Sequence, residues 1–175
     1  MILQTDRLII REMNKDDFDS LFAVLSDESI MKHYPYAFDD KKVHEWIDRN
    51  IDRYETFGFG LWAVCHKETG EMIGDCGLTM QNIGGVIRPE IGYHIRKDKQ
   101  RQGYAREAAI AVRDWVFDNL PINRIYSYMK YTNEPSAKTA ISWGCKFDFE
   151  YPDEVNEVTK VYSITRNEWK IINNN

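Results

Sequence analysis

A short basic turn between an extended run and a helical run has the clearest potential for chemistry. Residues 100–105 read Gln-Arg-Gln-Gly-Tyr-Ala, and they follow an extended pattern at residues 90–95 and lead into a helical pattern near Gly103. The first N–H groups of a helix have no partner inside it, and the helix dipole adds partial positive charge there. This segment therefore predicts a binding site for an anion such as a diphosphate.

Side chains suited to proton transfer lie on both sides of this turn. Glu90 and His94 belong to the extended run, and each has the chemistry of a general base. The alternative for Glu90 is a surface carboxylate paired with Arg88, and the alternative for His94 is a packed or solvated strand residue. Further along the chain, Asn133 and Ser136 suit the cap and first turn of a short helix.

Nucleophilic and metal chemistry find no support in the sequence. There is no Ser-His-Asp or Cys-His signature, no His-Glu-x-x-His motif and no Cys-x-x-Cys pair. We therefore expect no metal site. We also expect core positions for the three cysteines, which are Cys65, Cys76 and Cys145.

Length and composition indicate one globular domain over residues 1–175. The chain is 43% apolar and 29% charged, which is ordinary for a folded domain and argues against disorder. A net charge of -5 argues against a broad nucleic-acid-binding face and suits cationic partners such as amines. No run approaches the ~18 apolar residues of a membrane helix, and no signal-peptide pattern is present, so we expect a cytoplasmic protein without membrane contact.

Hydrophobic periodicity places the candidate residues in a succession of strands and helices. Apolar stripes predict helices at residues 14–25, 40–54, 103–120 and 133–143, the third of them ended by Pro121. Extended patterns predict strands at residues 3–12, 59–66, 72–80, 90–96, 122–131, 146–151 and 155–166, with a loop at 81–89. A hairpin-rich sheet flanked by helices belongs to the α+β class, with mixed strand pairing.

Four segments in this order resemble those of a known family. They are residues 5–11 (Thr-Asp-Arg-Leu-Ile-Ile-Arg), 69–74 (Thr-Gly-Glu-Met-Ile-Gly), 90–93 (Glu-Ile-Gly-Tyr) with 100–105, and 133–136 (Asn-Glu-Pro-Ser). Over nearly its full length the chain is similar to the GCN5-related N-acetyltransferases (GNAT), in the branch of the ribosomal-protein alanine acetyltransferases. One departure is visible: after Gly144 the usual phenylalanine arrives two residues late, at Phe147.

The resemblance implies the GNAT fold, with a mixed, mostly antiparallel sheet of about seven strands flanked by about four helices. It also implies acetyl-CoA as the co-substrate. The turn would hold the diphosphate through the backbone of Arg101, Gln102, Gly103, Tyr104, Ala105 and Arg106. The strand end would pair with the pantetheine arm and bond the thioester oxygen through the backbone of Tyr93, His94 and Ile95. Asn133 would contact the pantetheine, and Ser136 would lie near the sulfur.

The expected reaction is direct acetyl transfer to an amine, which requires no nucleophilic residue on the enzyme. The resemblance makes Glu90 the candidate base, acting directly or through a water relay. The thiolate that leaves would be protonated by Ser136 or Tyr131. Because a thiol has a reference pKa of only ~8.5, this second proton transfer needs little help from a strong acid.

The leading expectation for the acceptor is a protein N-terminal α-amine. An α-amine, with a pKa near ~8, loses its proton more readily than an alkyl amine with a pKa near ~10. The alternatives are a small-molecule amine (a polyamine, an amino acid or an aminoglycoside) and a non-catalytic acetyl-CoA-binding module. We expect acceptor-binding groups in residues 31–36 and 81–88, and either a monomer or a homodimer.

Overall fold

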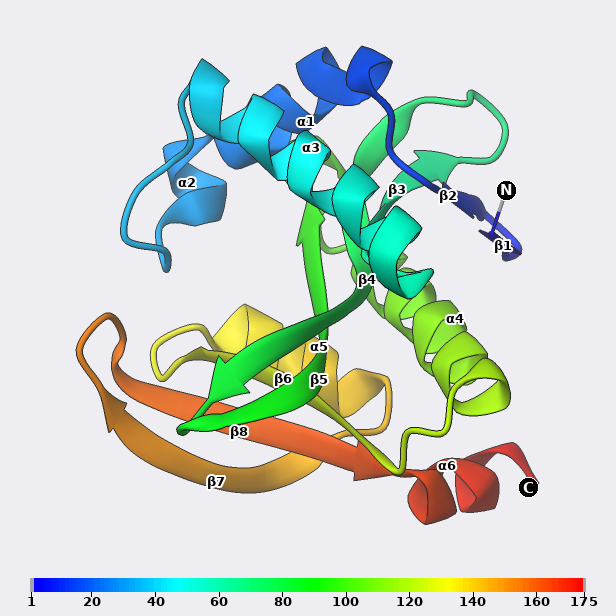
Figure 1. Ribbon diagram of the computed structural model, residues 1–175, viewed down its shortest axis with the longest axis vertical. Coiled ribbons are helices and arrows are strands. Elements are labelled where there is room, and N and C mark those ends of the chain that lie inside the picture. Colours follow the sequence, from blue (N-terminus) through cyan, green and yellow to red (C-terminus); the bar gives the residue numbers. More distant parts are fainter. Residues whose placement is uncertain (1, 175) are drawn as a thin grey trace.

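The computed structural model describes residues 2–174 and is built around one eight-stranded sheet (Figure 1). In chain order the strands are β1 (Leu3–Gln4), β2 (Leu8–Arg11), β3 (Leu61–His66), β4 (Met72–Ile83), β5 (Val86–Ile95), β6 (Arg124–Lys130), β7 (Lys146–Asp153) and β8 (Glu157–Thr165). Across the sheet they follow the order β1-β2-β3-β4-β5-β6-β8-β7.

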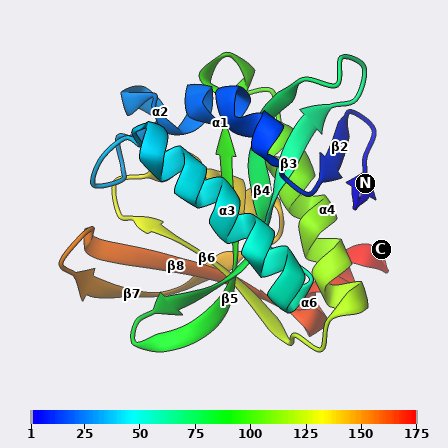
Figure 2. The ribbon, with the colours of Figure 1, turned by 45° about the horizontal axis from the view of Figure 1, so that its top comes forward.

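The sheet opens between β5 and β6. All other neighbouring strands are antiparallel, whereas these two are parallel and share a single register pair, Glu90 with Tyr126. Beyond this pair β5 has no strand partner on its β6 side among the described residues. Figure 2 shows the two halves that result, with β3 and β4 in one and β7 and β8 in the other.

Helices cover both faces of the sheet (Figure 1). They are α1 (Phe18–Leu25), α2 (Glu28–Met31), α3 (Asp40–Phe57), α4 (Tyr104–Asn119), α5 (Glu134–Ser142) and α6 (Arg166–Asn173). Successive side chains of a strand point to opposite faces, and β3 follows this rule. Trp62 and Val64 join the core under α4 and α5, whereas Leu61, Ala63 and Cys65 join the core under α1 and α3.

Helix α4 forms where the sequence predicts it because its apolar residues lie on one face. Ala108, Ala109, Val112 and Val116 are fully buried against the sheet, and the two alanines permit a close approach of helix and strands. The helix starts directly after Gly103, and it ends before Pro121, which cannot donate the next helical hydrogen bond. Its first turn is thereby placed at the end of β5.

The loop predicted at residues 81–89 is wrong, because these residues form the end of the β4–β5 hairpin. β4 and β5 continue through this segment and close at Gly84 and Gly85, whose φ angles are 62° and 81°. Two consecutive residues in the left-handed region suit a two-residue hairpin turn. Ile83 is fully buried beside Tyr126 and Val161, so tertiary packing supports the extension of the hairpin.

Among the described residues there are eight strands and six α-helices, more than the about seven and about four expected. The predicted first strand is divided into β1 and β2. Helix α2 forms between the first two predicted helices, and α6 follows the last strand, which ends one residue before its predicted end at residue 166. Thr165 and Glu168 make a capping box there, which starts a helix at Arg166. None of the helices in residues 2–174 is long and apolar enough to cross a membrane.

Candidate active site

A cleft with a volume of about 800 Å³ lies where the sheet opens. Its walls come from α2 and the segment after it, the end of β5, the turn before α4, and α5. The size suits a bound small molecule or cofactor. Ten of the eleven predicted cofactor-binding residues line it, namely Tyr93, His94, Ile95, Arg101, Gly103, Tyr104, Ala105, Arg106, Asn133 and Ser136.

The turn before α4 presents unpaired backbone donors to this cleft. Arg101 and Gly103 both adopt left-handed backbone conformations, with φ angles of 59° and 85°. Within the described part of the chain, the N–H groups of residues 101–106 have no hydrogen-bond acceptor. Successive N–H groups of a tight turn, continued by those of a helix start, can make a concave set of donors, which is the geometry of an anion site.

Arg7 fixes this turn from a distant part of the sequence. Its Nη1 donates to the carbonyl of Gln102 at 2.9 Å, and its guanidinium lies 4.4 Å from the ring centre of Tyr104. Gln102 itself does not line the cleft: its side chain donates to the carbonyl of Asp98 at 2.9 Å and so belongs to the frame of the turn. The sequence marks Arg7 only as part of a family resemblance, so this contact needs the tertiary structure.

Glu107 completes the brace from the first turn of α4. Its carboxylate is 2.6 Å from Arg7 and also accepts a 2.6 Å hydrogen bond from Thr5. Burial opposes the ionisation of Glu107, but the hydrogen bonds from Thr5 and Arg7 outweigh it and hold its pKa below the ordinary value. The segment before β2 is thus tied to the start of α4.

The end of β5 brings a free strand edge into the same cleft. Tyr93, His94 and Ile95 line it, and β6 pairs with β5 only at Glu90. Backbone N–H and C=O groups along an unpaired edge can bond an extended amide chain. On the opposite edge β4 lies close, because a Cβ atom at Gly74 would fall 2.0 Å from the carbonyl oxygen of His94.

Asn133 and Ser136 are held where β5 meets α5. Asn133 caps α5 by accepting from the Ser136 N–H at 3.2 Å, as its predicted cap role requires. The Tyr93 hydroxyl donates to the Ser136 carbonyl at 3.0 Å and lies 3.4 Å from the Ser136 hydroxyl. Burial raises the pKa of Tyr93 above its ordinary value.

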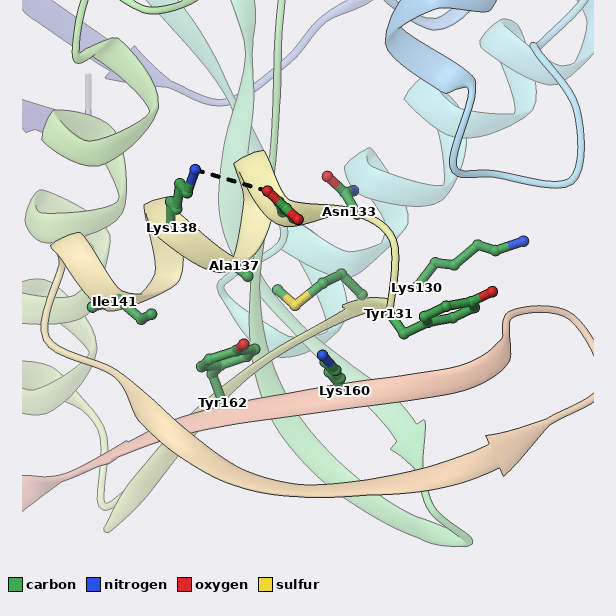
Figure 3. Close-up of a pocket in the computed structure, with 10 residues that line it drawn as sticks. Lys130, Tyr131, Asn133, Ala137, Lys138, Ile141, Lys160 and Tyr162 are labelled. Carbon is green, nitrogen blue, oxygen red and sulfur yellow. Dashed lines mark ion pairs between the residues drawn. The ribbon is translucent and has the colours of Figure 1, made fainter.

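Tyr131 lies apart from these groups. It borders a second, smaller hollow of about 210 Å³ between α5 and β8, where Lys160 and Tyr162 form the facing wall (Figure 3). Its hydroxyl donates to the Glu157 carboxylate at 3.3 Å. Of the two residues predicted to protonate the thiolate, only Ser136 lines the large cleft.

Glu90 is buried at the point where the sheet opens. It is 8% exposed, and its carboxylate accepts a hydrogen bond of 3.0 Å from the Thr79 hydroxyl. Burial raises the pKa of Glu90 to about 7, against the opposing effects of Thr79 and His94. The alternative pairing with Arg88 is wrong, because Arg88 donates instead to the Tyr126 hydroxyl at 2.8 Å and stacks over that ring.

His94 takes part in a chain of hydrogen bonds that the sequence did not predict. Its Nδ1 lies 2.8 Å from the Asp75 carboxylate, and its Nε2 lies 2.8 Å from the Tyr34 hydroxyl. Trp46 Nε1 donates to the other Asp75 oxygen at 3.0 Å. Burial lowers the pKa of His94, but the charge of Asp75 and the hydrogen bond with it outweigh this, so the pKa is raised. Asp75 is opposite His94 in the β4–β5 register, and a correct hairpin register would have placed the two together.

Only one of the two segments predicted to bind the acceptor lines the large cleft. Lys32, His33 and Tyr34 line the large cleft, so the segment after α2 does reach it. The second segment, residues 81–88, contributes nothing to the lining and forms the β4–β5 hairpin instead. Of the two segments, only the one after α2 borders the cleft.

The other reactive side chains lie in the interior. Cys65, Cys76 and Cys145 are buried and free, and burial raises the pKa of each thiol. Within residues 2–174, no three His, Cys, Asp or Glu side chains are grouped as they would be around a metal ion.

Comparison with known proteins identifies the class of protein that this fold and cleft define. Residues 7–146 match the acetyltransferase (GNAT) domain family. The uncharacterized protein YkkB of Bacillus subtilis is 31% identical over 93% of this chain and 92% of its own length. The uncharacterized N-acetyltransferase YoaA of the same organism is 28% identical over 94% of this chain and 97% of its own length.

Solved structures share the fold. An acetyltransferase (GNAT family) from Bacillus anthracis superimposes with a TM-score of 0.82 at 21% identity, over 95% of this chain and 99% of that one. The ribosomal L7/L12 α-N-protein acetyltransferase RimL, solved with coenzyme A, superimposes with a TM-score of 0.77 at 15% identity, over 94% and 97% of the two chains. The chain belongs to the GNAT acetyltransferase family and is an acetyl-CoA-dependent N-acyltransferase.

Proposed function

We propose that this protein transfers the acetyl group of acetyl-CoA to the α-amine of a protein N-terminus. The observation that carries the proposal is the meeting of two features in one cleft. The unpaired N–H groups of residues 101–106 suit the diphosphate, and the open edge of β5 at Tyr93, His94 and Ile95 suits the pantetheine arm and the thioester oxygen.

In this arrangement Glu90 receives the proton of the attacking amine. Its carboxylate lies outside the lining of the cleft, so the proton reaches it through water. The carbonyl carbon bonds to the amine nitrogen and releases the thiolate near Ser136, whose hydroxyl faces Tyr93. A backbone N–H of the β5 end bonds the oxygen on which charge develops during attack.

The proton balance favours an α-amine. Burial raises the pKa of Glu90 to about 7. Taking a proton from an α-ammonium with a pKa of ~8 costs about one pK unit, or about 1.4 kcal/mol, whereas an alkylammonium near ~10 costs about three times as much. The fold shared with the α-N-protein acetyltransferase RimL supports the same acceptor class.

Thiol release with acetyl-CoA tests the proposal on a matched pair of peptides. The first has a free N-terminus and no lysine, and the second has a blocked N-terminus and one internal lysine. We expect turnover of the first and little of the second, with mass spectrometry placing the acetyl group on the α-nitrogen. Faster thiol release with a polyamine, amino acid or aminoglycoside than with the peptide would show that the acceptor is a small-molecule amine. Binding of CoA without turnover of any amine would indicate a non-catalytic module.

A further inference from the structure

A chain of four side chains joins the interior of the protein to the cleft. It runs from Trp46 on α3 through Asp75 on β4 and His94 on β5 to Tyr34, which follows α2. Asp75 is fully buried and His94 is 8% exposed, whereas Tyr34 is 44% exposed and lines the cleft. Four segments of the protein thus contribute to this chain of hydrogen bonds, and it ends at the Tyr34 hydroxyl in the cleft.

We propose that Asp75, His94 and Tyr34 form a proton relay that protonates the leaving thiolate of CoA. The inference rests on the proposed acetyl transfer and assigns its acid side to residues other than Ser136 and Tyr131. When the C–S bond breaks, the sulfur takes the hydroxyl proton of Tyr34, and Tyr34 takes the Nε2 proton of His94. The imidazolium becomes neutral imidazole and regains a proton from solvent before the next turnover.

The hydrogen-bond directions allow this sequence. A carboxylate can only accept, so the proton shared by Asp75 and His94 belongs to Nδ1. In the imidazolium form Nε2 donates to the Tyr34 oxygen, which leaves the hydroxyl proton free to point into the cleft. Trp46 holds the second Asp75 oxygen and fixes the orientation of the carboxylate.

The charges around His94 favour the protonated form that the relay needs. Asp75 faces it from β4, and Glu90 lies on the same strand, and both raise the His94 pKa. Tyr34 is the neutral partner at Nε2, and the positive charge of Arg53 on α3 acts on Glu90 and lowers the Glu90 pKa. Glu90 and His94 are two titratable groups in one strand with opposite tasks, base and acid.

The neighbouring candidates are less suited to the acid role. Tyr131 lines the other hollow, and its hydroxyl donates a hydrogen bond to the Glu157 carboxylate. Ser136 lines the cleft, but its hydroxyl faces the Tyr93 hydroxyl at 3.4 Å, and burial raises the Tyr93 pKa, so Tyr93 is a poor source of a replacement proton. His94 behind Tyr34 provides that renewal.

The test compares Tyr34→Phe with the control Tyr151→Phe, a tyrosine of β7 that lines neither hollow. Steady-state rates are measured from pH 6 to 10 with acetyl-CoA and a free α-amine peptide. We expect Tyr34→Phe to lower kcat by about tenfold, the small effect reflecting the low thiol pKa, with the KM for acetyl-CoA within about twofold. The fall of kcat at high pH, which reports loss of the His94 proton, should disappear. Tyr151→Phe should match the unchanged protein.

A second variant separates a relay from a structural contact. Asp75→Asn removes the charge that favours the imidazolium, so the fall of kcat should move to lower pH, and NMR titration of the His94 ring in the CoA complex should show the same displacement. If the unchanged protein turns over but Tyr34→Phe keeps its kcat and its high-pH fall, the relay is overturned and the proposed function stands. If the unchanged protein acetylates no amine, the proposed function fails and the relay with it.

Discussion

Arg7 and Glu107 lie 2.6 Å apart although 100 residues separate them in the chain. The pair joins the segment before β2 to the first turn of α4, and Arg7 also bonds the carbonyl of Gln102 in the turn. Since the turn supplies the unpaired N–H groups of the cleft, this ion pair helps to hold the proposed anion site in shape. The ion pair positions the turn more than it stabilises the fold, because exposed ion pairs add little to the free energy of unfolding.

Arg7→Ala should therefore weaken acetyl-CoA binding more than it weakens the fold. We expect the KM for acetyl-CoA to rise about threefold to tenfold, with a loss of less than about 1 kcal/mol in the free energy of unfolding. Arg124→Ala is the control, because Arg124 is equally exposed and pairs with Asp148 at 3.0 Å, and neither residue lines the cleft. Equal KM values in the two variants would contradict the brace.

Gly103→Val should damage the same site directly. Gly103 has a φ of 85°, which a β-branched residue resists, and its missing side chain keeps the backbone accessible to a diphosphate. We expect the KM for acetyl-CoA to rise at least about tenfold. Gly70→Val tests strain alone, because Gly70 has a φ of 72° with open space around it. If calorimetry showed that both variants bind CoA with equal affinity, the proposal that this turn binds the diphosphate would be wrong.

Glu90→Gln should change the pH dependence of the reaction. Glu90 must be ionised to accept the amine proton, and its pKa is about 7, so kcat should fall as the pH drops below neutrality. The variant should lose this acidic limb and about a hundredfold in kcat. The fall of kcat at high pH should begin at a lower pH in the variant, because the Glu90 charge no longer raises the pKa of His94. Glu68→Gln, in an exposed turn, is the control, and an unaltered profile in Glu90→Gln would clear Glu90 of the base role.

The same substitution should change how stability depends on pH. The pKa of Glu90 is higher in the fold, at about 7, than its ordinary value of 4.5, so the folded state holds this proton more tightly. This contribution is fully present below pH 4.5 and is lost as the pH rises through 7, a loss of about 3 kcal/mol. Urea unfolding at pH 4.5 and pH 8 should show the loss in the unchanged protein and not in Glu90→Gln. Parallel curves for the two proteins would show that Glu90 ionises without cost.

The residues that the sequence predicts to bind the cofactor come together in one cleft, and this has a physical reason. The turn at residues 100–105 and the helix after it depend on local features: Gly103, the alanine stripe and Pro121. Ten of the eleven predicted cofactor-binding residues line one cleft in the structure. Local patterns did less well at residues 81–89, where Gly84 and Gly85 read as a loop. There the buried contacts of Ile83 extend both strands.

The proton-transfer groups show where local patterns stop. The acidic type and the strand position of Glu90 are visible in the sequence, but its neutral-range pKa comes from burial by distant residues. Asp75 and Tyr34 carried no signal of their own, because hairpin register and the packing of α2 bring them to His94. Tyr131 seemed equivalent to Ser136 in the sequence, and the fold directs the two to different hollows.

The sequence by itself determined the class of fold, the turn proposed to bind an anion and the kind of chemistry, since these depend on residue type at short spacing. The tertiary structure decided which side chains share the cleft, which carboxylate is desolvated and which histidine has a partner on each ring nitrogen. Those properties depend on distances between segments up to 100 residues apart, as Arg7 and Glu107 demonstrate. Only the folded chain sets such distances.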